Sequence, residues 1–147
     1  MLANVKSPLD VLHKAKARLK DNNSIISIQT GYHPLQFKKL LYDYVYHEHY
    51  SYFTIKSIEA LGNQCNLEIV DYKLLELRGG TLRIHLKNSE KGLKDIKNSR
   101  LKEDFSLKED YSILESLIEQ NKKRINGELK ELKKRGFQII GFGASHS

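Results

Sequence analysis

The chain has 147 residues, 39% of them hydrophobic, with one Cys, eight Tyr, five Phe, no Trp and a formal charge of +7. The length is that of about one domain, and the aromatic content argues against intrinsic disorder. The single Cys excludes an intrachain disulfide and a cysteine zinc site, and the lack of a long apolar run or signal sequence predicts a cytoplasmic protein without a membrane partner.

The positive charge favours anionic partners, because 25 Lys and Arg face 18 Asp and Glu. The basic residues alternate with acidic ones along most of the chain, whereas a nucleic-acid-binding surface gathers them into one stripe. We therefore do not expect a nucleic acid partner. The same charge would attract a nucleotide-bearing small molecule.

The first expected elements are a helix and a strand. Ser7 and Pro8 are typical of a helix start, and apolar residues at helical spacing predict a helix that runs to about Lys20. Residues 24–29 are short, rich in Ile and bounded by turn-forming residues, which predicts an interior strand of the parallel type. A helix leading into such a strand is typical of a doubly wound α/β sheet.

A second helix and a hairpin follow. Thr54 is the expected N-cap of a helix that ends near Asn66 and carries Cys65 in its apolar stripe. Residues 67–77 and 81–86 predict two strands joined across Arg78, Gly79 and Gly80, since glycine readily adopts the positive φ of a tight connection.

The remaining residues predict a long helix and a last strand. A short helix is expected over 90–96, and Ser106 with Glu109 forms a capping-box pattern that opens a long helix with a core-facing apolar stripe. Gly136 is the expected helix terminator, and residues 137–140 predict a buried strand. Gly141-Phe142-Gly143 then resembles the glycine turn at the start of a nucleotide-binding helix.

Three interpretations compete for the titratable run Tyr46-His47-Glu48-His49. His47 and His49 could share one face of an extended segment and bind a metal, with His33 as a third ligand. The run could instead be a loop packed by its aromatic rings. Finally, a histidine could be a general base, because an imidazole with a pKa of about 6.5 is largely neutral at physiological pH.

The runs Gln29-Thr30-Gly31-Tyr32, Tyr46-His47-Glu48-His49-Tyr50-Ser51-Tyr52-Phe53 and Arg78-Gly79-Gly80-Thr81-Leu82-Arg83 resemble a known family. This family is the S-adenosylmethionine-dependent sugar-nucleotide C-methyltransferases. The resemblance covers the later half of the methyltransferase domain, and the long helix with 136–145 resembles the passage into the family's C-terminal domain. It implies an α/β fold: a partial Rossmann-like sheet ending in a β-hairpin, a long helix and the first strand of a second Rossmann-like domain.

The resemblance also implies a reaction. In this family a base removes the proton next to the ketone of a nucleotide-linked 4-ketohexose, and the enolate attacks the sulfonium methyl group. The resemblance places the base on His49, with Glu48 and Tyr46 in support, and leaves His47 a structural role. It further implies a nucleotide-sugar substrate, for which Gly79, Gly80, Gly141 and Gly143 are the candidate contacts. We expect no metal, because nothing in the sequence fixes a third ligand near the two histidines.

The glycine turn and acidic strand end that bind the cofactor in this family lie outside the sequence. We therefore expect a methyltransferase fragment or split subunit, inactive alone, with a second chain supplying the cofactor-binding half. Its expected parts are half of a methyltransferase domain (1–88), a linking helical segment (89–136) and the start of a sugar-nucleotide domain (137–147). The alternative is a noncatalytic nucleotide-sugar or anion-binding module.

Overall fold

A computed structural model describes residues 2–41, 44–89 and 107–143, with the backbone alone for 107–110. The chain is mixed α/β and divides into two compact units, Met1–Asp104 and Phe105–Ser147. The short helix predicted over 90–96 and the predicted cap Ser106 lie outside the described residues. Within the described residues, no helix combines the length and apolarity needed to cross a bilayer.

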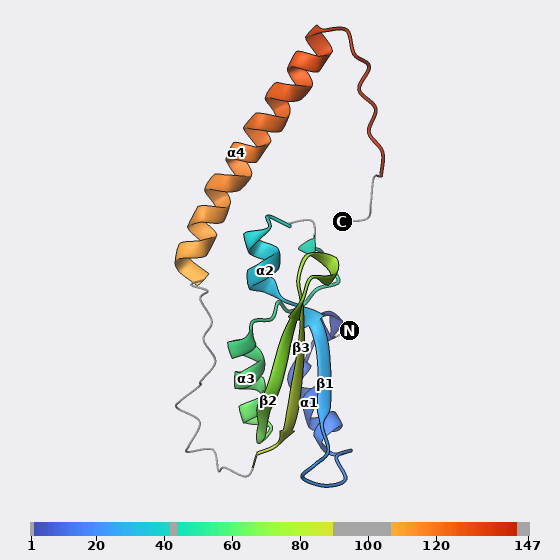
Figure 1. Ribbon diagram of the computed structural model, residues 1–147, viewed down its shortest axis with the longest axis vertical. Helices are drawn as coiled ribbons and strands as arrows, with labels where there is room; N and C mark the ends of the chain where they lie inside the picture. Colours follow the sequence, from blue (N-terminus) through green and yellow to red (C-terminus); the bar gives the residue numbers. More distant parts are fainter. Residues whose placement is uncertain (1, 42–43, 90–106, 144–147) are drawn as a thin grey trace. The chain divides into compact units, whose positions relative to one another are not determined.

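Short helices and three strands make up the first unit (Figure 1). In chain order they are η1 (Leu2–Asn4), α1 (Pro8–Lys16), β1 (Ile26–Gly31), α2 (His33–Lys38), α3 (Ile55–Gln64), β2 (Leu67–Leu75), η3 (Leu77–Gly79) and β3 (Thr81–Asn88).

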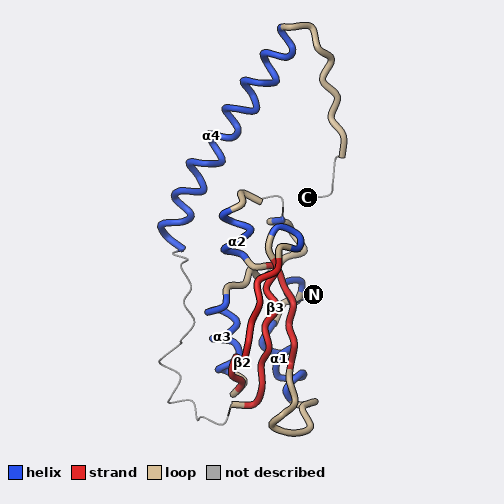
Figure 2. The backbone as a smooth tube through the Cα atoms, in the orientation of Figure 1, coloured by secondary structure: helices blue, strands red, loops and turns tan. Residues whose placement is uncertain are grey.

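The strands form one antiparallel sheet in the order β1-β3-β2, so the second strand of the hairpin lies in the middle (Figure 2). The predicted hairpin is confirmed. The prediction of an interior, parallel-type strand is wrong, because β1 is an edge strand of this sheet and runs antiparallel to β3. The physical reason lies in its alternation: Ile28 and Thr30 are buried while Ser27 and Gln29 are exposed, so only one face of β1 joins the core.

The core lies between one face of this sheet and the helices. Leu82, Ile84 and Leu86 alternate along β3 and are fully buried, in one cluster with Leu12 of α1 and Ile58 of α3. The intervening residues of β3 point to the other face, which is polar and at least partly exposed. The first unit is therefore built from a sheet with one apolar face.

The helix starts agree with the sequence-based predictions. Ser7 Oγ accepts a hydrogen bond from the Asp10 N–H at 3.2 Å, and Pro8 is the first residue of α1. This helix ends at Lys16 rather than Lys20, because the N–H groups of Arg18 and Leu19 donate to carbonyl oxygens three residues earlier. Thr54 caps α3 in a reciprocal capping box with Ser57.

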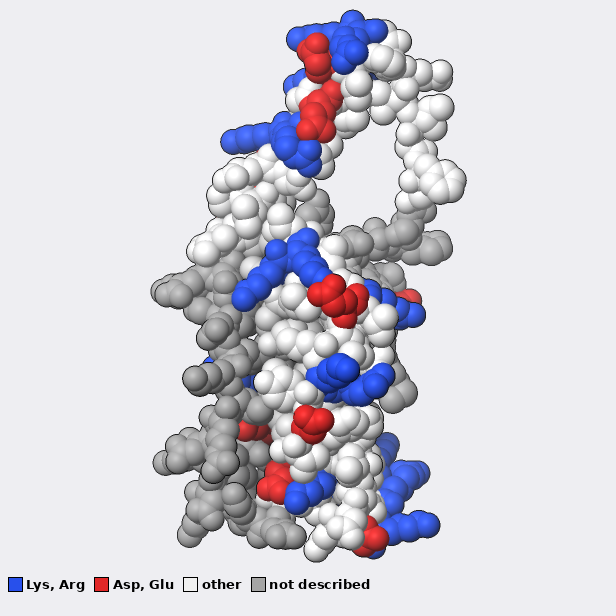
Figure 3. Space-filling model, viewed as in Figure 1, with Lys and Arg blue, Asp and Glu red and all other residues white. Residues whose placement is uncertain are grey.

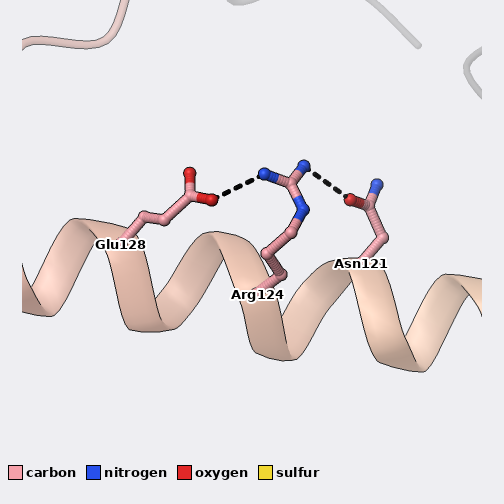
Figure 4. A network of polar contacts seen from close by, with 3 residues as sticks. All are labelled: Asn121, Arg124 and Glu128. Carbon is pink, nitrogen blue, oxygen red and sulfur yellow. Dashed lines mark hydrogen bonds and ion pairs between the residues drawn. The ribbon is translucent and has the colours of Figure 1, made fainter.

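The second unit consists of the long helix α4 (Leu107–Lys134) and the segment after it. The helix and its terminator are confirmed, with Gly136 at φ +82°. On its surface, Arg124 binds Glu128 at 2.7 Å and Asn121 at 2.9 Å (Figure 4). In each unit, basic and acidic side chains are interspersed on the face seen in Figure 3.

Two expectations for the second unit are wrong within the described residues. The apolar stripe of α4 is exposed, at Ile113, Leu117, Ile125, Leu129 and Leu132. Residues 137–140 are neither a strand nor buried. A strand needs a neighbour for its backbone groups, and the described part of this unit offers only a helix, whose backbone groups bond internally.

Candidate functional site

A pocket of about 630 Å³ lies in the first unit, at the end of the sheet where β1 stops. Its lining comes from η1, the end of β1, helix α2, the segment 44–53 and the turn between β2 and β3. The pocket therefore joins all three runs that carry the family resemblance.

Short backbone contacts hold these segments together. The Tyr32 N–H donates to the Gly80 carbonyl oxygen and the His33 N–H donates to that of Phe53, both at 3.0 Å. Gly31 ends β1 directly beside the side chain of Gln36, whose amide atoms lie 3.0 Å from where a Cβ would stand. A larger residue at this position would push Gln36 away from the pocket wall.

His49 lines the pocket, where its imidazole contacts a backbone carbonyl and an aromatic ring. Its Nδ1 lies 3.0 Å from the carbonyl oxygen of Tyr44, and the Tyr46 ring packs against the imidazole with centroids 4.2 Å apart. Because a carbonyl oxygen only accepts, Nδ1 carries the hydrogen and Nε2 is the unprotonated nitrogen of the neutral ring. No described residue forms a hydrogen bond with Nε2.

His33 lies in the same pocket and is held by the same tyrosine. Its Nδ1 is hydrogen-bonded to the Tyr44 hydroxyl, and its ring contacts those of Phe37 and Tyr52. Burial lowers the pKa of His33 below its ordinary value, because desolvation disfavours the charged imidazolium. Tyr44 thus contacts one histidine with its backbone and the other with its side chain.

Only two of the four residues in the run 46–49 line the pocket. Tyr46 and His49 meet in the pocket, while His47 and Glu48 are exposed and do not line it. The position beside Nδ1 that a supporting carboxylate would occupy is taken by the Tyr44 carbonyl. Across the described ranges, no three His, Cys, Asp or Glu groups lie close enough together to hold a metal ion.

The four glycines predicted to contact substrate lie outside the pocket lining. Gly79 and Gly80 have φ of +78° and +145°, and a Cβ on them would meet Leu41 and Leu35 at 1.9 and 2.9 Å. These two therefore serve the turn and its packing. Gly141 and Gly143 belong to the second unit, where the described atoms leave space open around both.

Arg78 and Gln36 are among the lining residues that sequence reasoning missed. Arg78 has φ +47° and ψ +44°, a left-handed conformation that few non-glycine residues adopt. Gln36 is only 5% exposed, and its Oε1 has no hydrogen-bond partner among the described residues. The position of Arg78 before two glycines was the one available signal, whereas nothing in the sequence marks Gln36.

Comparison of the sequence with protein-family models and with curated proteins finds no match.

Proposed function

We propose that this chain supplies the base and part of the sugar site of a C-methyltransferase that acts on a nucleotide-linked ketosugar, with S-adenosylmethionine as methyl donor. The observation that carries the proposal is the position of His49. It lines a pocket, its Nδ1 is engaged by a carbonyl oxygen, and its Nε2 is available to accept a proton. The run 46–53, on which the resemblance depends most, forms one wall of that pocket together with Tyr44.

The step assigned to this chain is the removal of a proton from the carbon next to the ketone. Nε2 of His49 takes the proton, the C–H electron pair forms the carbon–carbon double bond of the enolate, and the ketone oxygen becomes the enolate oxygen. A positioned base contributes about 10²–10⁴-fold to such a step. The phenol of Tyr46, beside the imidazole, is the candidate hydrogen-bond donor to the developing negative charge.

The described lining residues of the pocket offer no acidic partner for S-adenosylmethionine. That molecule carries cationic sulfonium and ammonium groups, whereas Arg78 is the only Lys, Arg, Asp or Glu among the lining residues that the structure describes. No carboxylate of the lining could bind those cations. We therefore place the methyl donor outside this pocket and assign no step to it here.

The sheet supports a Rossmann-like half-domain completed by another segment or chain. It ends in a β-hairpin, as the resemblance implies. Among the described residues, β3 is the only strand that pairs with β1, and the isolated parallel bridge between Tyr32 and Phe53 lies just beyond the end of β1. An edge with free N–H and C=O groups can pair with a further strand. In this proposal that strand belongs to the part that holds the methyl donor.

A noncatalytic nucleotide-sugar-binding module is the second candidate. The described lining residues include one cation, Arg78, and no carboxylate, and this arrangement suits an anionic ligand whether or not a reaction follows. The two candidate functions differ in one respect: an enzyme removes the proton from the carbon next to the ketone, whereas a binding module leaves it in place.

The test is solvent exchange at that carbon, which needs no methyl donor. The full chain is incubated in D₂O with a nucleoside-diphosphate-linked 4-ketohexose, and the proton signal next to the ketone is followed by NMR. We expect the signal to decay faster than in protein-free buffer, and His49→Gln to return the rate to that of buffer. The matched control is His47→Gln, the same change at an exposed residue of the same run, which should keep the wild-type rate.

Equal rates for the wild type and His49→Gln would contradict the assignment of the base. Ligand binding by the wild type without any exchange would favour the noncatalytic module.

A further inference from the structure

The charge distribution of the pocket is one-sided. The described lining contains Arg78 and no Lys, Asp or Glu, and the polar groups around it are amides, hydroxyls and histidines. Because burial favours the neutral form of His33, that ring adds no fixed charge. Arg78 forms no ion pair with any carboxylate that the structure describes. Among the lining residues that the structure describes, Arg78 is therefore the one that carries a fixed charge.

The backbone at Arg78 is held in an unusual conformation. At φ +47° and ψ +44° a glycine or asparagine would be more readily accommodated than an arginine. Residues in sparsely populated conformations persist where surrounding structure enforces them, and they cluster at ligand-binding sites. Here the Gln36 Nε2–H donates to the Arg78 carbonyl oxygen at 3.5 Å, and Gly79 continues the turn.

The neighbouring amide gives an independent indication of a ligand. Gln36 lines the same pocket, and only 5% of the residue is exposed. Its acceptor oxygen, Oε1, has no hydrogen-bond partner in the described part of the chain. Buried acceptors are rarely left unsatisfied, and a ligand hydroxyl is a donor that could satisfy this one. The amide with this unused acceptor oxygen thus belongs to a residue that contacts the backbone of Arg78 and lines the same pocket.

We propose that Arg78 is the phosphate anchor of this pocket: its guanidinium binds the diphosphate of a nucleoside-diphosphate-linked ligand, while the hydroxyl-bearing part of that ligand reaches Gln36 and His49. The inference rests on the proposed function for the identity of the ligand. The planar fork of arginine matches phosphoryl oxygens in a two-point contact that lysine cannot reproduce. The ligand class is therefore a diphosphate joined to a polyol.

Inorganic pyrophosphate is the probe, titrated into the full chain by calorimetry at low and at physiological ionic strength. We expect Arg78→Gln to weaken pyrophosphate binding by about tenfold or more, and Arg78→Lys to give an intermediate affinity, since it keeps the charge and loses the fork. Arg78→Gly removes the guanidinium while suiting the backbone, so it should also lose binding with no loss of thermal stability.

The matched control is Lys87→Gln, which removes one positive charge from the other end of β3, roughly 20 Å along the strand from Thr81. It should bind pyrophosphate within about twofold of wild type. Equal weakening in Arg78→Gln and Lys87→Gln would mean that pyrophosphate is attracted only by net charge, and it would overturn the proposal. Wild-type affinity in Arg78→Gln would overturn it as well.

This test separates the inference from the proposed function. If pyrophosphate binding depends on Arg78 but the wild type shows no deuterium exchange, Arg78 is the phosphate anchor and His49 is not the base. If deuterium exchange depends on His49 but pyrophosphate binding does not depend on Arg78, His49 is supported as the base and the proposal for Arg78 is contradicted.

Discussion

The imidazole Nδ1 of His49 lies 3.0 Å from the backbone carbonyl oxygen of Tyr44. Because the carbonyl oxygen can only accept, this contact favours a hydrogen on Nδ1 and leaves Nε2 as the nitrogen that we propose as the base. A backbone carbonyl also differs from a carboxylate in that it brings no charge to the pocket. Among the described lining residues there is no carboxylate, so the proposed base would take its proton in a pocket whose one described fixed charge is positive.

Folding stability should depend on pH through His33. Burial lowers the pKa of His33, so in the interval below about 6.5 the unfolded chain binds more protons at this residue than the folded chain. The free energy of unfolding should therefore rise with pH across that interval, by at most about 1.4 kcal/mol per pH unit from this group. Urea titrations at a series of pH values from about 5 to about 6.5 measure this slope.

The comparison is between His33→Gln and His47→Gln. The first variant should lose this part of the slope, whereas the second changes an exposed histidine and should keep it. If the free energy of unfolding changes with pH equally in the wild type and in His33→Gln, the pKa of His33 is the same in the folded and the unfolded chain, which would contradict this prediction.

Gly80 should prove essential to the fold rather than to ligand contact. At φ +145°, and with Leu35 2.9 Å from the position of a Cβ, Gly80→Ala forces an unfavourable backbone and a displaced leucine. We expect a loss of about 1–3 kcal/mol in the free energy of unfolding. Thermal melts measure it, with Gly127→Ala as the control, since a Cβ there meets nothing described and alanine favours a helix. A stable Gly80→Ala variant with impaired ligand affinity would instead support the substrate role expected for this glycine.

The Cys65 thiol should be unreactive in the folded chain. It is 2% exposed, and burial raises its pKa, although Lys16 acts in the opposite direction. We expect a thiol reagent at pH 8 to modify the native chain at least about a hundredfold more slowly than the chain in 8 M urea, which requires an opening free energy of about 3 kcal/mol. Comparable modification rates in buffer and in 8 M urea would show that the Cys65 thiol is accessible to the reagent in the folded chain.

The central strand should be the most sensitive part of the sheet. Ile84 is fully buried in β3, so Ile84→Ala should lower the free energy of unfolding by about 2–5 kcal/mol. His85→Ala, one residue later and on the other face, should cost much less because its side chain is partly exposed. Chemical denaturation of both variants gives the two values, and similar losses would contradict the assignment of the buried face.

The local features of the fold could be predicted because each has a local cause. Ser7 and Thr54 cap helices through their own hydroxyl groups, and Gly79 and Gly80 supply the positive φ that the hairpin connection needs. The strand order could not be predicted in the same way. Pairing of β1 with β3 joins residues far apart in the sequence, and the pattern of an isolated strand does not reveal its neighbour.

The candidate site was predictable in part for a similar reason. Tyr46 and His49 stand out as side chains in a dense polar run. The Tyr44 carbonyl is a backbone atom, which leaves no trace in the sequence, and Arg78 comes from a distant turn that only the folded sheet brings to the pocket. The exposed segment 137–140 shows the converse: its apolar pattern predicts a buried strand, but burial requires a neighbour.

The most direct test of the central claim, that His49 presents an unprotonated Nε2 to the pocket, is the tautomer of its ring. Long-range ¹H–¹⁵N correlation spectra of the full ¹⁵N-labelled chain report both ring nitrogens, and His49→Gln identifies the signals. At a pH where the ring is neutral, we predict a protonated Nδ1 and an unprotonated Nε2. A ring protonated at Nε2, or one that exchanges evenly between the two tautomers, would contradict the account.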